Sequence, residues 1–228
     1  MRCTRWLTAA MTALIALPLI AAEAKKPLKA AGSIELTDPA GDVAPIHSSS
    51  GTDYPGLDVV KLSVKSDGKQ VAFVATLKDP PGAFASDVIE TYIDADNNPK
   101  TGVTLTYPPI GGFEYYGRLN SCVDYTDGSS ACAGGGGKAK PKAHWSAMSL
   151  ARYKGTSQYD REDVLDDMGF PGRKKATATP VTGNVLRGVF DYQDLKLKSG
   201  QTIRLVIREA GDNGADDGRF PDILLTLK

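Results

Sequence analysis

The clearest pattern in the chain is the recurrence of short segments in which apolar side chains alternate with polar ones or run together. Val59–Val64 and Val71–Leu77 are two such segments. Alternation with a period of two places successive side chains on opposite faces of an extended chain, which is typical of a β-strand. Asp67-Gly68 lies between the two segments, and Gly supplies the positive φ that a tight turn needs. This part of the sequence therefore predicts a β-hairpin.

Seven further segments carry the same strand signature: Ser33–Thr37, Val88–Ile93, Glu114–Asn120, Ala143–Tyr153, Val185–Tyr192, Thr202–Glu209 and Ile223–Leu227. With the hairpin they make about nine strands. The intervening segments are too short for helices and are rich in Gly, Pro, Asn, Asp and Ser. We therefore expect an all-β fold, a two-sheet antiparallel β-sandwich. One short helix is expected at Arg161–Met168, with Asp160 as its N-cap and Gly169 as its stop.

The first 24 residues have the pattern of a secretory signal peptide. Two arginines precede an apolar stretch, which ends at Ala22-Glu23-Ala24. An anchoring helix is the alternative, but three threonines and Pro18 interrupt a stretch that must supply about 20 apolar residues to cross a bilayer. We expect cleavage after Ala24, a linker over 25–31, and a single domain over 32–228. The mature protein is expected to be secreted or periplasmic.

The charge of the mature chain is close to neutral. Cleavage removes Arg2, Arg5 and Glu23, so the 27 basic and 27 acidic residues become 25 and 26, a net charge of −1. Binding to nucleic acid or to an anionic membrane needs a concentrated basic face. We therefore expect neither nucleic acid nor, after cleavage, a membrane as a partner.

Two cysteines, Cys122 and Cys132, remain after cleavage. In an exported protein such a pair favours a disulfide, and its spacing fits neither a redox Cys-x-x-Cys motif nor a zinc knuckle. The bond would close the base of the low-complexity segment 127–142, which contains four consecutive glycines followed by three lysines. That segment is either a mobile basic flap over a binding face or a tolerated insertion in a hairpin loop.

A cluster of oxygen-bearing side chains follows the strand Val88–Ile93. Asp94, Asp96 and Asn98 occupy alternate positions there, and a turning loop can aim such side chains at one cation. Two carboxylates held so close are costly unless a cation neutralises them. The sequence therefore predicts a Ca²⁺ site.

This loop is not an EF-hand, because Pro99 and Leu105 stand where that motif needs Gly and Glu. The remaining ligands must then come from elsewhere in the fold. Asp38, Asp42 and Asp58 are the second-choice ligands, because a sandwich can bring the exit of the first strand near a neighbouring strand end. The acidic residues Asp212, Asp216 and Asp217 form either a second cation site or none.

Several short segments together resemble a known family: Asp38-Pro39-Ala40-Gly41-Asp42, Leu57-Asp58-Val59-Val60, Tyr92–Gly102, and Phe190–Leu195 ahead of Lys198-Ser199-Gly200. They are similar to the DOMON-like sandwiches related to family 9 carbohydrate-binding modules. The resemblance covers most of the mature chain, in short patches. It implies a Ca²⁺-stabilised β-sandwich that binds sugar or haem, or that serves as an accessory domain beside enzymes.

The resemblance departs from the family at the ligand. Its sugar-binding members stack the ligand between paired tryptophans, whereas cleavage leaves Trp145 alone here. Tyr115 and Tyr116 are the candidates to assist it, although strand aromatics usually pack in a core. The haem-binding members ligate iron through Met with His or Lys. The matching residues here are Met148, Met168, His47 and His144, and Met in a strand is more often core filler.

Catalytic motifs are missing from the sequence. It contains no Gly-x-Ser-x-Gly, no His-Glu-x-x-His and no Gly-x-x-x-x-Gly-Lys segment. A carboxylate-pair glycosidase stays open, because its two acids can come from any part of a fold. The leading hypothesis is an exported, monomeric, non-enzymatic β-sandwich with structural Ca²⁺, which binds a polysaccharide or another exported protein. The alternatives are a haem-b-binding DOMON-type electron-transfer domain and a purely structural or interaction accessory protein.

Overall fold

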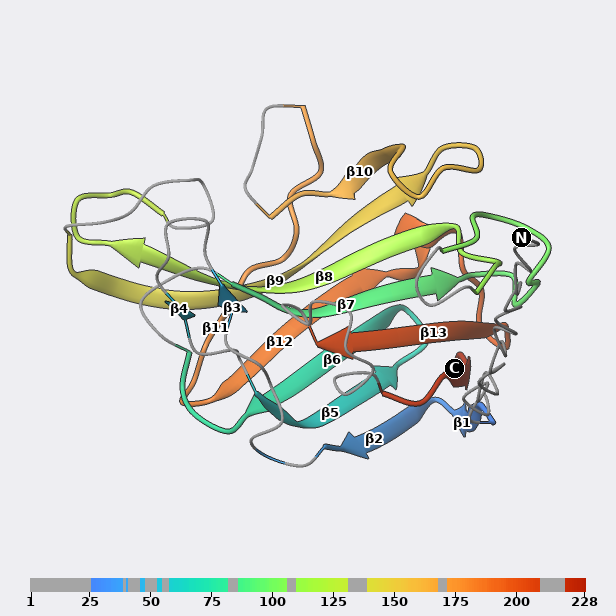
Figure 1. Cartoon of the computed structure of the whole chain (residues 1–228), viewed down its shortest axis with the longest axis horizontal. Coiled ribbons are helices and arrows are strands. Elements are labelled where there is room, and N and C mark those ends of the chain that lie inside the picture. Colours follow the sequence, from blue (N-terminus) through green and yellow to red (C-terminus); the bar gives the residue numbers. More distant parts are fainter. Residues whose placement is uncertain are drawn as a thin grey trace, which may run out of the picture.

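The protein is a β-sandwich, as its alternating pattern predicts. The computed structural model describes residues 26–38, 40, 46–47, 53–54, 58–81, 86–105, 110–130, 139–167, 172–209 and 220–228. Two stacked sheets enclose one main hydrophobic core in this part of the chain (Figure 1). No helix among these residues is long and apolar enough to cross a membrane. The predicted signal peptide lies outside the described residues.

Fourteen strands and one short 3₁₀ helix make up the described part of the chain. They are β1 (Leu28–Ala31), β2 (Ser33–Thr37), β3 (Ile46–His47), β4 (Asp53–Tyr54), β5 (Val59–Ser66), β6 (Gln70–Leu77), β7 (Ser86–Asp94), β8 (Tyr115–Tyr125), β9 (Pro141–Tyr153), β10 (Arg161–Leu165), β11 (Thr179–Pro180), β12 (Val185–Asp191), η2 (Tyr192–Leu195), β13 (Thr202–Glu209) and β14 (Ile223–Thr226).

The larger sheet, sheet A, has the order β1-β14-β13-β7-β8-β9-β10, with β11 paired to β9. The smaller sheet, sheet B, has the order β12-β6-β5-β2, and β3 and β4 pair with each other. All neighbours are antiparallel except β1, which runs parallel to β14. In Figure 1 the long strands β7, β8 and β9 cross above the strands of sheet B.

All nine predicted strands are present, but the expected number of strands and the expected linker are wrong. The chain has more strands than nine, because β1, β3, β4, β10 and β11 are segments of two to five residues, too short to show a clear alternating pattern in the sequence. The predicted linker 25–31 is also shorter than expected. Leu28–Ala31 forms β1 and pairs along its length with Ile223–Thr226. Its main-chain groups thereby extend sheet A by one edge strand.

The predicted helix at Arg161–Met168 is a further error. Arg161–Leu165 is the edge strand β10, and it pairs with the end of β9. A chain reversal joins the two strands, in which the Lys154 amide donates to the carbonyl of Asp160 at 2.8 Å. A helix of eight residues is marginal by itself in water, whereas the strand gains a ladder of hydrogen bonds. Among the described residues the one short helix is η2, and Met168 and Gly169 lie outside them.

The predicted Asp67-Gly68 hairpin is confirmed between β5 and β6. Asp67 accepts hydrogen bonds from the amides of Lys69 and Gln70 at 2.9 and 2.8 Å, and Gly68 has a φ of 98°.

The core between the two sheets is apolar and closely packed. Phe73 and Phe190 are examples, with ring centroids 5.8 Å apart and almost no exposed surface.

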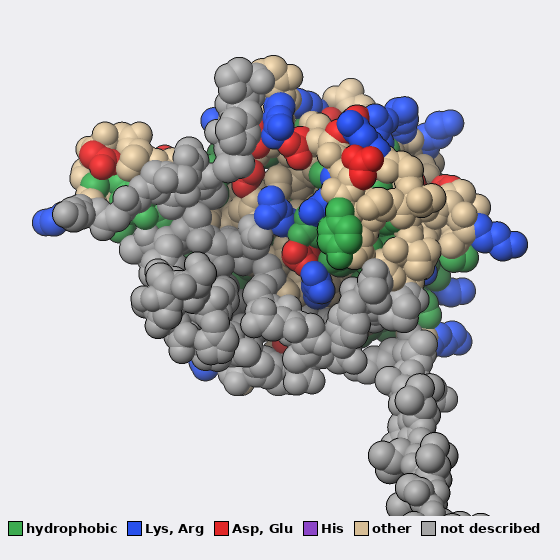
Figure 2. All heavy atoms as spheres, turned by 45° about the horizontal axis from the view of Figure 1, so that its top comes forward, with side chains coloured by type: hydrophobic (Ala, Val, Ile, Leu, Met, Phe, Trp, Pro, Cys, Tyr) green, Lys and Arg blue, Asp and Glu red, His purple; other side chains and the backbone are tan. Residues whose placement is uncertain are grey.

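A second hydrophobic cluster lies on the outer face of sheet A, away from the main core. Its members are Tyr92, Val103, Leu105, Phe113, Tyr116, Tyr153 and Val206, with Ile110 against them. The segment between β7 and β8 supplies several of these residues and so covers the sheet at this point. Arg204, Arg208 and Arg161 lie over the rings of Phe113, Tyr92 and Tyr116. In the face shown in Figure 2, acidic and basic side chains are interspersed over the described surface.

Candidate metal centre

Three carboxylates meet where β7 ends and β8 begins. Asp94 is the last residue of β7, Asp96 follows in the turn, and Glu114 directly precedes β8. One carboxylate oxygen from each lies within 4.8 Å of the others. Asp94 is fully buried, Glu114 is half-buried and Asp96 is exposed. The group therefore has a buried base and one open side.

Strand pairing explains why Glu114 joins the two aspartates. β7 and β8 are antiparallel neighbours with Ile93 opposite Tyr115, so the residues just beyond each strand end are close. The Glu114 amide donates to the Ile93 carbonyl at 3.1 Å, and the Ala95 amide donates to Glu114 Oε2 at 2.8 Å. These two bonds fix the backbone on both sides of the site.

The turn after β7 is organised by the same carboxylates. The Asn98 amide donates to Asp94 Oδ1 and to Asp96 Oδ1, at 3.0 Å each. Thr101 Oγ1, which has one proton to donate, lies within hydrogen-bond distance of both oxygens of Asp96, at 2.9 and 3.1 Å. Asn98 Oδ1 accepts from the Lys100 amide at 3.1 Å. Asn98 was predicted to be a ligand. Its amide and its side-chain oxygen both make hydrogen bonds within the turn.

One guanidinium offsets part of the negative charge. Arg204 Nε and Nη2 lie 3.1 and 3.0 Å from Asp94 Oδ2, and Nη2 also donates to the Gly111 carbonyl. Burial raises the pKa of Asp94, and the Asn98 amide and Arg204 lower that pKa only in part. Burial likewise raises the pKa of Glu114; the Ala95 amide lowers that pKa in part, and the charges of Asp96 and Asp94 raise it further. Three carboxylates face the single positive charge of Arg204, so the site has an excess of negative charge when all three are ionised.

One ligand atom in the site is unsatisfied. Glu114 Oε1 is buried and has no hydrogen-bond partner. A buried carboxylate oxygen without a partner is costly, and a bound cation would supply the missing interaction. The three carboxylates that meet here offer oxygen as the ligand atom, and this group of described residues includes no His or Cys. Such a donor set suits a hard cation such as Ca²⁺ rather than zinc.

Two glycines allow the covering segment to approach the site closely. Gly102 has a φ of 62°, and a Cβ there would clash with the Phe113 carbonyl and lie 2.9 Å from Glu114 Oε1. Gly112 has a φ of 100°, and a Cβ there would lie 2.9 Å from the Arg204 guanidinium. Both positions need a residue without a side chain. Gly102, in the segment after β7, thus has a steric role.

The second-choice ligands are not brought to this site. Asp38 donates its amide to Val60, and Asp58 directly precedes β5. The next amide, that of Val59, donates to Glu209 at 3.1 Å. Glu209 and Arg204, which binds Asp94, lie toward opposite ends of β13. They are five residues apart, a distance of roughly 16 Å along a strand. Asp38 and Asp58 are therefore at the other end of the sandwich, and Asp42 lies outside the described residues.

The acid that sequence reasoning missed is Glu114. It stands at the start of the predicted strand Glu114–Asn120, and a carboxylate at a strand start carries no distinctive local pattern. Strand pairing could have identified it, because pairing that strand antiparallel with Val88–Ile93 places Glu114 beside Asp94. The acidic loop with Asp212, Asp216 and Asp217 lies outside the described residues.

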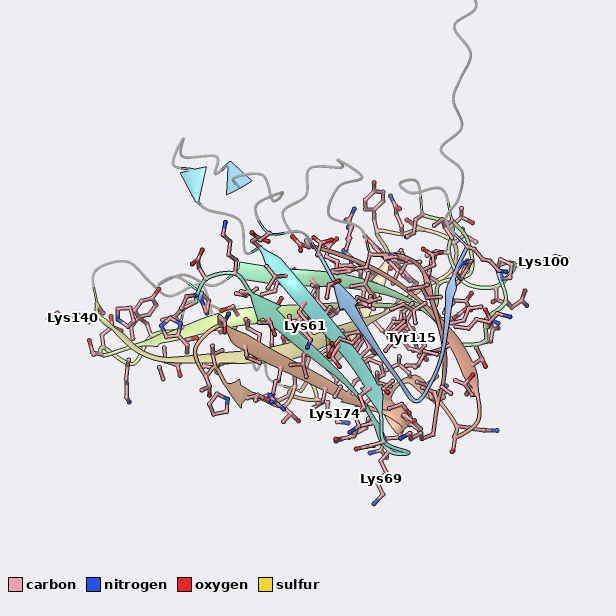
Figure 3. The ribbon with its side chains drawn as sticks, turned by 90° about the horizontal axis from the view of Figure 1, so that it is seen from below. Lys61, Lys69, Lys100, Tyr115, Lys140 and Lys174 are labelled. Atoms are coloured by element: carbon pink, nitrogen blue, oxygen red, sulfur yellow. The ribbon has the colours of Figure 1, made fainter. Side chains whose placement is uncertain are left out.

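The aromatic residues predicted to bind sugar are largely in packed positions. Tyr115 belongs to the main core and donates its hydroxyl to the Leu195 carbonyl at 3.3 Å (Figure 3). Tyr116 belongs to the second hydrophobic cluster, and its hydroxyl donates to Glu90. Trp145 is half-buried, with its indole N–H donating to Asp124 at 3.0 Å. Tyr115 and Tyr116 thus follow the alternative interpretation, in which strand aromatics form core.

The residues considered for haem are dispersed or outside the described part. Met148 is fully buried between the sheets, where a Cβ on Gly117 or Gly188 would meet it at 2.6 or 2.8 Å. It fills the core, with no space beside it. His144 is half-buried on β9, the side chain of His47 is not described, and Met168 lies outside the described residues.

Cys122 lies fully buried in β8, and Cys132 lies outside the described residues, so their disulfide stays a prediction. The predicted flexible segment 127–142 ends earlier than expected, because Pro141 already starts β9. Residues 131–138 of that segment lie outside the described part. No family model matches the chain, and no match was found among the curated proteins or the solved structures.

Proposed function

We propose that the protein is an exported, non-enzymatic β-sandwich domain that holds a structural Ca²⁺ ion between Asp94, Asp96 and Glu114. The observation that carries the proposal is the meeting of three carboxylates within 4.8 Å around a buried oxygen, Glu114 Oε1, that has no hydrogen-bond partner. The DOMON-like resemblance, which implies a Ca²⁺-stabilised sandwich, points the same way.

The position of the site favours a role in stability over one in catalysis. Asp94 is fully buried and tied to Arg204, so its carboxylate cannot reach a polymeric substrate. The cation would instead join the end of β7, the start of β8 and the segment between them. That segment covers the second hydrophobic cluster through Val103, Leu105 and Phe113. A bound ion therefore holds the cover of this cluster in place.

Calorimetry of the purified mature domain tests the proposal. A ligand that binds only the folded state raises the melting temperature. We expect saturating Ca²⁺ to raise the melting temperature relative to EDTA. Equal melting temperatures in Ca²⁺ and EDTA would show that the three carboxylates do not form a cation site.

Carbohydrate binding is retained as a prediction about the ligand of the domain. Of the three predicted stacking residues, Trp145 alone is not buried: it packs against the main core and keeps part of its side chain exposed. A Trp145→Ala variant should then lose retardation in affinity electrophoresis on soluble polysaccharides, whereas the folded wild-type protein is retarded. A wild-type protein that no polysaccharide retards and no glycan array captures would leave the structural or interaction role.

A further inference from the structure

A hollow of about 490 Å³ opens on the outer face of sheet A, beside the candidate metal centre. Three strands and one turn line it: β1 with Lys29, Ala30 and Ala31, β14 with Leu224 and Thr226, β13 with Thr202, and the turn after β7 with Asn97. Figure 3 shows Lys100, from the same turn as Asn97, at the end of the molecule where β1 lies. The volume is in the range of small-ligand sites.

The floor of the hollow is set by strand register. Ala31, Thr226 and Thr202 are successive partners across β1, β14 and β13, so they form one row on one face. Lys29 and Leu224 are partners in the next row. Thr202 Oγ1 and Thr226 Oγ1 are 3.0 Å apart. Because one of these hydroxyls donates to the other, the pair keeps one donor and several lone pairs for a ligand.

The charge of the hollow is positive. Lys29 is exposed and makes no ion pair with a described residue, and no acid lines the hollow. The next cation along the row is Arg204, opposite Leu224, and it is committed to Asp94. Lys29 is therefore the one lining charge available to a ligand.

The wall of the hollow is held in a defined position. Asn97 has a φ of 53°, a left-handed conformation that Asn tolerates better than most residues. The next amide, that of Asn98, is tied to both Asp94 and Asp96. The amide side chain of Asn97 is thus presented by a turn with several internal bonds. It offers both a donor and an acceptor.

We infer that this hollow binds a small hydroxylated carboxylate, of the class of sugar acids. Lys29 pairs with the carboxylate, Asn97 and the threonine pair bond to ring hydroxyls, and Leu224 and Ala31 pack against the C–H groups of the ring. A phosphate is a poorer match, because its charge and geometry call for an Arg fork or several N–H donors, which the lining lacks. A neutral sugar leaves Lys29 without its partner. The inference does not rest on the calcium proposal.

NMR titration of the full mature chain with sodium D-glucuronate tests the inference, with D-glucose as the neutral ring. We expect saturable shifts at the amides of Asn97, Thr202 and Thr226, with a Kd of the order of 10⁻³ M. Lys29→Gln should weaken glucuronate binding about tenfold, because it removes the only cation that meets the carboxylate. Lys65→Gln is the matched control: Lys65 is an exposed strand lysine on β5 of sheet B, and its loss should change nothing.

Three results would overturn the inference: no saturable shift with glucuronate, equal binding of glucose, or unchanged binding by Lys29→Gln. Titration in Ca²⁺ and again in EDTA separates this site from the proposed metal centre, because glucuronate binding in EDTA supports the hollow whatever the fate of the calcium proposal. Oligogalacturonates identify the source of the carboxylate. Affinity that rises with chain length indicates a polymer, and constant affinity per ring indicates a free sugar acid.

Discussion

Replacing Glu114 with Gln should change the stability of the protein in opposite directions with and without Ca²⁺. Gln keeps an oxygen that can accept the Ala95 amide, so the backbone contact at 2.8 Å is retained. The change removes one of three mutually repelling carboxylates, and the raised pKa of Glu114 shows that its charged form is disfavoured in the folded state. In EDTA the variant should therefore be as stable as the wild-type protein or more stable.

In Ca²⁺ the order should reverse, because the variant lacks one charged ligand. Calcium sites of extracellular modules have Kd values down to the order of 10⁻⁴ M, so about 10 mM Ca²⁺ is about a hundredfold excess. Such an excess stabilises a binding-competent folded state by about 2.7 kcal/mol. For a domain of this size that corresponds to a rise in melting temperature of about 5–11 °C. The Glu114→Gln variant should lose most of this rise.

Differential scanning calorimetry of both proteins, each in Ca²⁺ and in EDTA, gives the four melting temperatures needed. Glu162→Gln is the control, because Glu162 is a partly exposed β10 residue that pairs with Arg152 and Lys154. Its substitution should shift stability by no more than about 0.5 kcal/mol and leave the Ca²⁺ increment intact. An equal Ca²⁺ increment in wild-type protein and Glu114→Gln would refute the assignment of Glu114 as a ligand.

Further predictions concern the pH dependence of stability and of the Ca²⁺ effect, the backbone at Gly102, and the two cysteines. The pKa values of Asp94 and Glu114 are raised above 3.8 and 4.5, so in EDTA the folded protein binds more protons than the unfolded chain. Its stability should therefore fall as the pH rises from these ordinary values through the raised pKa values of the folded state. Since Ca²⁺ needs both groups deprotonated, the Ca²⁺ increment in melting temperature should grow from about pH 4 to pH 7, and calorimetry showing a pH-independent increment would contradict this. Gly102→Ala should cost about 1–3 kcal/mol in urea unfolding, because its backbone is left-handed and its surroundings are closed, and a cost near zero would show that the segment yields easily. Peptide mapping without reductant should find Cys122 linked to Cys132, and two free thiols in the denatured protein would rule the disulfide out.

The strands were predictable because they carry their own signal. A half-buried strand such as Val71–Leu77 repeats its burial every second residue, and the structure has alternating burial over β6. The short strands carry no such signal. Arg161–Leu165 has one buried side chain, and its conformation is determined by pairing with β9. Leu28–Ala31 is likewise ordered by β14, a strand almost 200 residues away.

The candidate metal centre was predictable in part for the same reason. Asp94 and Asp96 are near in sequence, so their spacing alone indicates that they meet. Glu114 depends on which strands pair, and Asp38 and Asp58 were placed wrongly because a sandwich has two ends and a sequence does not say to which end a loop belongs. Once β7 is paired with β8, Glu114 is placed beside Asp94 as the third carboxylate of the cluster.

The most direct test of the central claim is an anomalous-scattering crystal structure of the mature domain grown in saturating Ca²⁺. We expect one peak among Asp94, Asp96 and Glu114, with carboxylate oxygens at about 2.3–2.6 Å from it, the range of Ca²⁺ coordination. Its shell should include Glu114 Oε1. A well-ordered site with no peak between these three residues would contradict the account.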